Sequence, residues 1–178
     1  MTKKQEKILN KALELFAEKG YHSTSTSTIA KEAGVSEGLI FRHFKNKDGL
    51  LKAILDHGKD IAQSYFEPIV NITDPKQVIA AIIEIPFRVD PVEHTFWRLV
   101  YTLKWQQHEY DRTANDMLNE LAIKAFTKLN YPNPKAEAEI LEIIMDGAAT
   151  AILLKENLEE NETLIKSLKL KYNIDETV

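Results

Sequence analysis

Six consecutive residues near the N-terminus, from Ser23 to Thr28, carry a side-chain hydroxyl group. A hydroxyl placed just before a helix can accept a hydrogen bond from an unpaired backbone N–H group of the first turn. A short helix is predicted directly after these residues, from Ile29 to Ala33. One or two hydroxyls are enough to cap that helix, so the others are available to solvent or to another partner.

The residues that follow predict a second short helix that packs against the first. Gly34-Val35-Ser36 favours a tight turn because glycine readily takes a positive φ, and Ser36 can cap a helix that runs to Phe44. Two short helices joined by such a turn form a helix-turn-helix. The expected core residues are Ile29, Ala33, Val35, Ile40 and Phe44. The residues left facing outward are Glu37, Gly38, Leu39, Phe41 and Arg42.

Helical spacing of apolar residues continues along nearly the whole chain. The N-terminal segment has Ile8, Ala12, Leu15 and Phe16 on one face and ends at Gly20. Further helices are predicted over residues 47–70, 75–88, 91–108, 111–130, 134–156 and 160–172, and Pro86 is expected to kink or end its helix. No segment shows a two-residue alternation bounded by hairpin turns. We therefore predict an all-α fold of about nine helices.

Composition and charge limit the class of protein. The chain of 178 residues is 44% hydrophobic and 28% charged, as in ordinary globular proteins. It has no cysteine, which excludes disulfides and thiolate zinc sites. No apolar run approaches the ~20 residues that cross a bilayer, and no signal peptide is evident. We expect a cytoplasmic protein that does not bind membranes.

The formal net charge of −4 is unevenly distributed. Residues 1–59 carry 11 Lys and Arg against 7 Asp and Glu, a net charge of +4, and residues 60–178 carry 12 against 20, a net charge of −8. A basic end joined to an acidic remainder suggests that only the first part meets a polyanion. A difference of this size on a short segment also arises by chance, so charge alone leaves nucleic-acid binding open.

Signatures of several enzyme classes are missing from the sequence. There is no phosphate-binding glycine loop, no H-E-x-x-H and no G-x-S-x-G. No acidic residue stands three positions before a histidine, as the di-iron helical bundles require. We therefore expect no enzyme, no cofactor and no metal site. A helical protein-interaction module without DNA binding is the alternative function.

The segment from Gly20 to Leu51 resembles the DNA-binding region of the TetR/AcrR family of transcriptional regulators. The shared features are an aromatic residue after glycine, a Thr-Ser pair, the stretches IAKEAGVS and SEGLIFRHF, and the helix start KNKDGLL. Together these motifs are far more specific than a helix-turn-helix alone. Beyond them the chain agrees with the family only in length and helical character. The resemblance implies a helix-turn-helix DNA-binding domain over residues 1–48 and a ligand-binding and dimerisation domain over 49–178.

The function implied by the resemblance is sequence-specific transcriptional regulation, usually as a ligand-responsive homodimeric repressor on a near-palindromic operator. The family lays its second helix across the DNA backbone and its third in the major groove. Hydroxyls and backbone N–H groups at the start of the second helix then face a phosphate. The residues implied at the DNA interface are Thr24, Ser25, Thr26, Ser36, Glu37, Gly38, Leu39, Phe41, Arg42, His43 and Lys47.

Three of these positions depart from the family's usual residues. Glu37 stands where many relatives have Lys or Arg, and its carboxylate can accept a hydrogen bond from cytosine N4 while it repels phosphates. Leu39 can contact a thymine methyl group. Phe41 replaces a common tyrosine and so lacks the phenol that bonds a phosphate. For each hydroxyl of the run, a cap or a solvated surface is the alternative.

The resemblance also implies a site for a small effector in the C-terminal part. Trp97, Tyr101 and Trp105 are spaced by four and form an aromatic stripe on one helix, which suits a lipophilic or aromatic ligand. An ordinary core is the alternative for such a stripe. The helix over 47–70 is expected to transmit ligand binding to the DNA-binding region. The residues predicted to line the pocket are Phe66, Phe87, Trp97, Tyr101, Trp105, Met117, Phe126 and Met145.

Two C-terminal helices are expected to pair with those of a second copy of the chain. Small residues among branched ones in the segment 134–156 allow a close approach of two helices. The residues predicted at this dimer interface are Ile140, Ile144, Gly147, Ala148, Ala151, Leu164 and Leu168. The alternative is a core within one chain, because it has the same helical periodicity.

Overall fold

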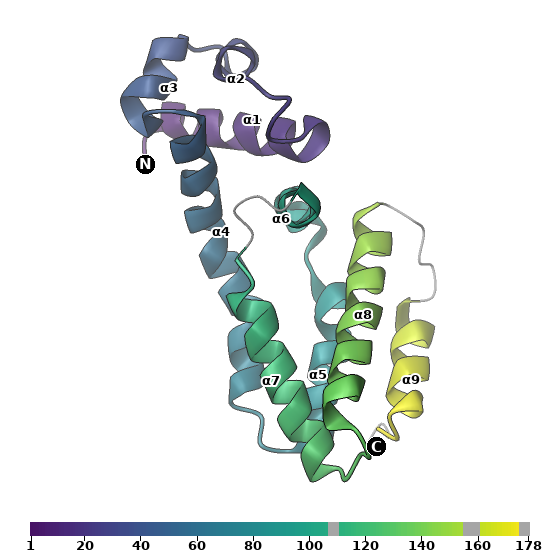
Figure 1. Cartoon of the computed structure of the whole chain (residues 1–178). Helices are drawn as coiled ribbons and strands as arrows, with labels where there is room; N and C mark the ends of the chain where they lie inside the picture. The colour runs from purple at the N-terminus through teal and green to yellow at the C-terminus, as the bar shows by residue number, and fades with distance from the viewer. Residues whose placement is uncertain (107–110, 155–160, 175–178) are drawn as a thin grey trace. The chain divides into compact units, whose positions relative to one another are not determined.

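The computed structural model describes residues 1–106, 111–154 and 161–174 (Figure 1). Within these ranges the chain forms nine α-helices and one 3-10 turn and has no strand, so the all-α prediction is confirmed. None of the described helices combines the length and the apolar character needed to cross a membrane. Residues 107–108, 155–156 and 160, at the predicted ends of three helices, lie outside the described residues.

The chain divides into two compact units. The first contains the described residues of 1–62 and 91–110, and the second contains those of 63–90 and 111–178. Helix α4 (Lys47–Val70) contributes residues to both. The resemblance implies a domain boundary between residues 48 and 49. This boundary does not coincide with those of the compact units, and it stays a prediction.

The first unit is built from α1 (Lys3–Lys19), α2 (Thr26–Ala33), α3 (Glu37–Phe44), the first part of α4, the 3-10 turn η1 (Pro91–Glu93) and α6 (His94–Gln106). Thr2 and Gln5 form a capping box that begins α1, and Gly20, with a φ of +83°, ends it. Helix α6 packs against α1 although about 80 residues separate them in the chain.

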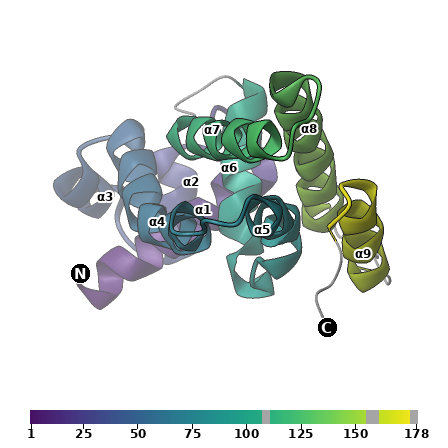
Figure 2. The same cartoon turned by 90° about the horizontal axis from the view of Figure 1, so that it is seen from below.

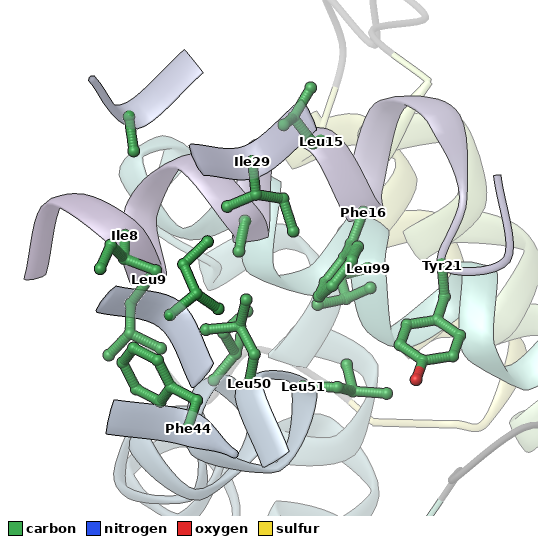
Figure 3. Packing of buried hydrophobic residues seen from close by; sticks show 14 of the residues in the cluster. Ile8, Leu9, Leu15, Phe16, Tyr21, Ile29, Phe44, Leu50, Leu51 and Leu99 are labelled. Carbon is green, nitrogen blue, oxygen red and sulfur yellow. The ribbon is translucent and has the colours of Figure 1, made fainter. Parts of the chain in front are cut away.

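The core of the first unit joins all of these helices (Figure 3). Ile8 and Phe16 of α1, Ile29 of α2 and Leu50 of α4 are fully buried, and Leu99 of α6 lies among them. Four of the five expected helix-turn-helix core residues are buried, and the fifth, Val35, is partly buried against the same cluster. This core fixes the orientation of α2 and α3.

A glycine allows the close approach of α4 and α6 inside this unit. A Cβ atom added to Gly58 would lie 2.0 Å from the Cε2 and Cζ atoms of Phe96. Real Cβ atoms do not come so close to a ring, and Phe96 is itself buried. No other residue type therefore fits at position 58 without a shift of the Phe96 ring or of the helices.

The second unit contains the end of α4, α5 (Pro75–Arg88), α7 (Thr113–Lys128), α8 (Pro134–Leu153) and α9 (Asn161–Lys171). Helix α5 packs against α7, α8 and α9, and α9 lies beside α8 on the side away from α7 (Figure 2). Pro86 lies in the last turn of α5, which ends at Arg88 as expected. The side chains of Ile79, Ile83, Phe126 and Leu141 are fully buried in the core of this unit.

Helix α9 is held by polar as well as apolar contacts. Lys169 Nζ lies 2.5 Å from a carboxylate oxygen of Glu84 on α5, and both side chains are more than four-fifths buried. Glu84 also pairs with Arg88 on its own helix. Removing one member of such a pair would leave the other charge largely buried, which is destabilising.

Candidate functional site

Helices α2 and α3 form the predicted helix-turn-helix. Ser25 is the N-cap of α2, and its hydroxyl oxygen accepts a hydrogen bond from the Thr28 N–H over 3.1 Å. Gly34 ends α2 in the left-handed conformation, with a φ of +64°. Ser36 occupies the N-cap position of α3, but its hydroxyl makes no capping hydrogen bond, contrary to expectation. The exposed Ser36 hydroxyl is therefore not used by its own helix.

Of the five α3 residues predicted to face outward, three are exposed and two are partly buried. Gly38 and Arg42 are exposed, and Phe41 is 47% exposed. Glu37 and Leu39 are partly buried, and Leu39 packs in part against the core of the first unit. The face thus combines one cation, one carboxylate and one aromatic ring around a glycine.

Gly38 has no explanation within the chain. A Cβ added there would meet no atom within 4 Å, so nothing in the fold requires a glycine. Within a helix, glycine costs about 1 kcal/mol of stability relative to alanine. The open space at Gly38 leaves the backbone of α3 accessible at this position.

The structure does not support a direct contact between Thr24 and a phosphate. Its side chain is buried, and its hydroxyl donates to the carbonyls of Gly20, over 2.9 Å, and Leu15, over 3.3 Å. The hydroxyl therefore fastens the turn after α1. Sequence reasoning grouped it with the exposed hydroxyls, because burial depends on how this turn packs.

Ser25 remains at the surface with two neighbouring hydroxyls. Its Oγ atom lies 2.9 Å from that of Ser27 and 2.8 Å from Oγ1 of Thr28. All three groups surround the start of α2, where the helix dipole favours an anion. Because each hydroxyl can rotate, the cluster can turn donors toward a phosphate oxygen.

Thr26 has a different partner from the one that the resemblance implied. Its hydroxyl donates to Oε1 of Glu37 over 2.6 Å, and this bond joins the first residue of α2 to the first residue of α3. The hydroxyl is thus engaged with a carboxylate rather than free for a phosphate. The sequence spacing of 11 residues contained no signal for this pair.

Lys47 begins α4 and holds the loop that leads into α2. Its ammonium donates to the carbonyls of Tyr21 and Thr24 over 3.0 and 3.1 Å and lies 4.3 Å from the centre of the Tyr21 ring. The Tyr21 hydroxyl donates to Asp48, the next residue of α4. A cation at a helix N-terminus is locally unfavourable. These two carbonyls account for it without a phosphate.

His43 contacts the start of α1. Its Nδ1 atom lies 3.4 Å from the Gln5 side-chain nitrogen, while the Gln5 side-chain oxygen accepts from the Thr2 N–H over 2.8 Å. The Gln5 side-chain nitrogen can only donate, so the Nδ1 atom of His43 is the acceptor in this contact. The Nε2 atom takes no part in this contact.

The residues predicted to line an effector pocket divide between the two units. Trp97, Tyr101 and Trp105 belong to α6 in the first unit, and Trp105 is 77% exposed. Phe126 is fully buried in the core of the second unit, where its ring packs against those of Tyr131 and Tyr172. Phe126 therefore belongs to the core of its own unit. The other members, Phe66, Phe87, Met117 and Met145, are partly buried residues of the second unit.

The predicted dimer residues fall into two groups. On α8, Ile140 is 43% exposed and Gly147 is also exposed, while Ile144, Ala148 and Ala151 are partly buried. Ile143, which belongs to the same stripe, is 70% exposed. On α9, Leu164 is exposed, but Leu168 packs against the core of its own unit. The prediction of Leu168 as an interface residue is therefore not supported.

A buried tyrosine, Tyr172, and a partly buried one, Tyr131, meet in the second unit. Burial, and to a smaller extent the Glu137 carboxylate, raises the pKa of both Tyr131 and Tyr172 above the ordinary value for a phenol. The Tyr131 hydroxyl donates to the Tyr172 carbonyl over 3.3 Å. The Tyr172 hydroxyl has no hydrogen-bond partner within the part of the chain that the structure describes. In the same part, no cluster of His, Cys, Asp or Glu could hold a metal ion.

Comparisons with known proteins agree with this arrangement. The family model "Bacterial regulatory proteins, tetR family" matches residues 8–54. The transcriptional regulator YvkB of Bacillus subtilis is 52% identical over 50 residues, 28% of this chain and 26% of YvkB. The chain spans less than half the length of the curated relatives it matches. These relatives are described as regulators rather than enzymes.

Solved structures match over nearly the whole chain. A TetR-like transcriptional regulator from Rhodococcus sp. RHA1 has a TM-score of 0.72 at 18% identity, over 96% of this chain and 95% of that one. AibR, solved with isovaleryl coenzyme A and operator DNA, has a TM-score of 0.67 at 17% identity, over 94% and 96% of the two chains. At these identities the likeness concerns the fold. The family match thus covers residues 8–54, and the solved structures share the fold over nearly the whole chain.

Proposed function

We propose that this chain is a sequence-specific DNA-binding transcriptional regulator that acts as a homodimer. The observation that carries the proposal is the outward face of α3, where Gly38 leaves open space that the fold itself does not use. In the TetR/AcrR family this helix enters the major groove. A missing side chain there allows the helix backbone to come close to the base edges.

The proposed DNA contacts come from two helix starts and one exposed face. Ser25 and Ser36 offer exposed hydroxyls at the starts of α2 and α3, and His43 offers its Nε2 atom to a phosphate. Phe41 and Arg42 project from α3 toward the groove. Lys47 can contact a phosphate only while its ammonium also keeps the hydrogen bonds to its two carbonyl partners. Thr24 is left out because its hydroxyl is buried.

The apolar stripe of α8 supports the homodimer. Ile140, Ile143 and Gly147 recur at spacings of three and four, so they share one face of the helix. Exposing a branched aliphatic side chain such as Ile143 to water is unfavourable, and a second copy of the helix would cover it. Two recognition helices then reach half-sites about 34 Å apart on a near-palindrome.

A small lipophilic or aromatic effector is proposed to control DNA binding. AibR was solved with an acyl coenzyme A and with operator DNA, and the aromatic residues of α6 offer apolar surface. Helix α4 begins at Lys47, whose ammonium donates to the Tyr21 carbonyl, and it continues into the second unit. A ligand that favours one position of α4 would shift the population of DNA-competent dimers. In this role the protein acts as a cytoplasmic repressor.

Selection of binding sites from a random duplex pool tests the proposal. The winning duplex is then titrated at several salt concentrations. An inverted repeat whose affinity falls steeply with salt is expected, because a dimer that neutralises several phosphates releases counterions. If folded, dimeric protein enriches no sequence and shows no salt-sensitive DNA binding, the proposal fails. The chain is then better explained as a helical protein-interaction module.

A further inference from the structure

The start of α3 carries a carboxylate that is held in place before any partner arrives. Glu37 is the first residue of α3, and its Oε1 atom accepts the Thr26 hydroxyl over 2.6 Å. Both side chains are only partly buried. No ion pair of Glu37 exists in the part of the chain that the structure describes. Oε2 therefore keeps its lone pairs available at the helix-turn-helix surface.

An ionised carboxylate is an acceptor without a donor, and this restricts what it can recognise. Phosphate oxygens are acceptors and carry negative charge, so Glu37 repels them. In the major groove the exposed amino group of cytosine is a donor that a carboxylate can accept. A flexible glutamate loses side-chain entropy when it binds, whereas the Thr26 hydroxyl has already restricted this one.

We propose that Thr26 is a positioning residue that holds Glu37 as the reader of a cytosine N4 amino group in each half-site. This inference rests on the proposed DNA-binding function. Thr26 then acts on DNA through Glu37 and not through a phosphate. The pair supplies specificity rather than affinity, because the carboxylate weakens contacts with any backbone phosphate nearby.

A purely structural role for the pair makes different predictions. Glu37 also sits in the first turn of α3, where a negative charge stabilises the helix, and the bond to Thr26 ties two helices together. Glutamine at position 37 would keep an oxygen that accepts from Thr26. If the role is only structural, Glu37→Gln leaves the selected bases unchanged.

The experiment selects sites from a random duplex pool with four full-length proteins, the natural chain and the variants Thr26→Val, Thr26→Ser and Glu37→Gln. The natural chain is expected to enrich one C·G pair per half-site, preferred about 10-fold or more over the other pairs. Glu37→Gln should lose this preference or change it to adenine, which an amide reads. It should also bind random duplex more tightly, because a repelling charge is gone.

Thr26→Val should select the same base with a preference reduced several-fold, and Thr26→Ser should restore it. Thermal unfolding of each variant shows whether it is folded when assayed, and Thr26→Ser and Glu37→Gln both keep a hydrogen-bonding group. An unchanged base preference in Glu37→Gln overturns the inference. An unchanged preference in Thr26→Val, with a changed one in Glu37→Gln, overturns the role of Thr26. If the natural chain itself enriches no site, the proposed function fails together with the inference.

Discussion

The exposed faces of α3 and α8 each carry a glycine in open space, but their neighbours are opposite in chemistry. Gly38 on α3 lies beside Glu37 and Arg42, whereas Gly147 on α8 follows Ile140 and Ile143. Polar neighbouring residues favour contact with a hydrated, charged partner, and apolar neighbouring residues favour a contact that excludes water. The two exposed glycines thus lie on surfaces of opposite chemistry, one polar and one apolar.

The largest expected effect on stability comes from a substitution at Gly58, which the fold requires, unlike Gly38 and Gly147. Gly58→Ala places a Cβ against the buried ring of Phe96, and we expect a loss of about 1–3 kcal/mol in the free energy of unfolding. Urea denaturation measures it. Gly147→Ala serves as the control, since its added Cβ meets no atom of the chain. Equal stability of the two variants would contradict the packing of α6 against α4.

A charge on the apolar face should separate the proposed dimer. Ile143→Lys buries no new group within the chain, because Ile143 is 70% exposed, so folding should be unchanged. The lysine would be desolvated at a dimer interface, and we expect the dimer dissociation constant to rise at least 10-fold. Sedimentation velocity over a range of concentrations measures it.

The matched control for this variant is Val92→Lys, which changes a residue that is 81% exposed in the first unit. It should leave self-association unaltered. If Ile143→Lys dimerises as tightly as Val92→Lys, the stripe of α8 is not the interface.

The two open glycines should respond alike in stability and differently in binding. Gly38→Ala and Gly147→Ala should each stabilise the folded chain by up to about 1 kcal/mol, because alanine favours a helix. Gly38→Ala should weaken binding to the selected duplex, and Gly147→Ala should weaken only self-association. Thermal unfolding, DNA titration and sedimentation measure the three quantities. A Gly38→Ala variant that gains stability and keeps its DNA affinity would remove the argument for close approach to DNA.

The smallest effect concerns a polar group that the second unit leaves unsatisfied. Tyr172→Phe removes a buried hydroxyl without a partner among the described residues and should stabilise the chain by up to about 1 kcal/mol. Tyr131→Phe is the contrast, because its hydroxyl donates to the Tyr172 carbonyl, and that variant should lose stability. If both variants shift the unfolding midpoint in the same direction, the hydrogen bonding of this pair differs from that described.

The same tyrosines should make stability fall in alkali. Because burial raises the pKa of Tyr172 in the folded chain, the neutral phenol is favoured there. Its contribution is complete below the ordinary tyrosine pKa of about 10 and is lost as the pH rises through the higher folded value. Unfolding measured from pH 9 to pH 11 should therefore show a slope that is smaller in Tyr172→Phe.

Much of the first unit could be predicted from sequence because its signals are local. The spacing of Ile29 and Ala33, the glycine at position 34 and the cap at Ser25 all act within a few residues. The roles of Thr24 and Lys47 could not be predicted in this way. Their partners depend on how the loop after α1 packs against α4, and side chains of the same type can bond solvent, DNA or a carbonyl.

In the second unit, helical periodicity alone could not predict which apolar residues stay exposed. An apolar stripe on a helix has the same spacing whether it faces its own core or a second chain. Leu168 and Leu164 belong to the same helix, yet only Leu164 is exposed. Which stripe remains uncovered follows from tertiary packing, so the exposure of Ile143 became evident only in the structure.

The packing of α6 against α1 also sets an order of events during synthesis. Leu99 and Leu103 complete the core around Ile8 and Phe16. The segment that carries the family motifs ends at residue 54, so the ribosome must add about 50 more residues before that core can close. At about 5–20 residues per second, the first unit of a nascent chain waits several seconds for α6. During that interval its apolar surface is open to chaperones and to neighbouring chains.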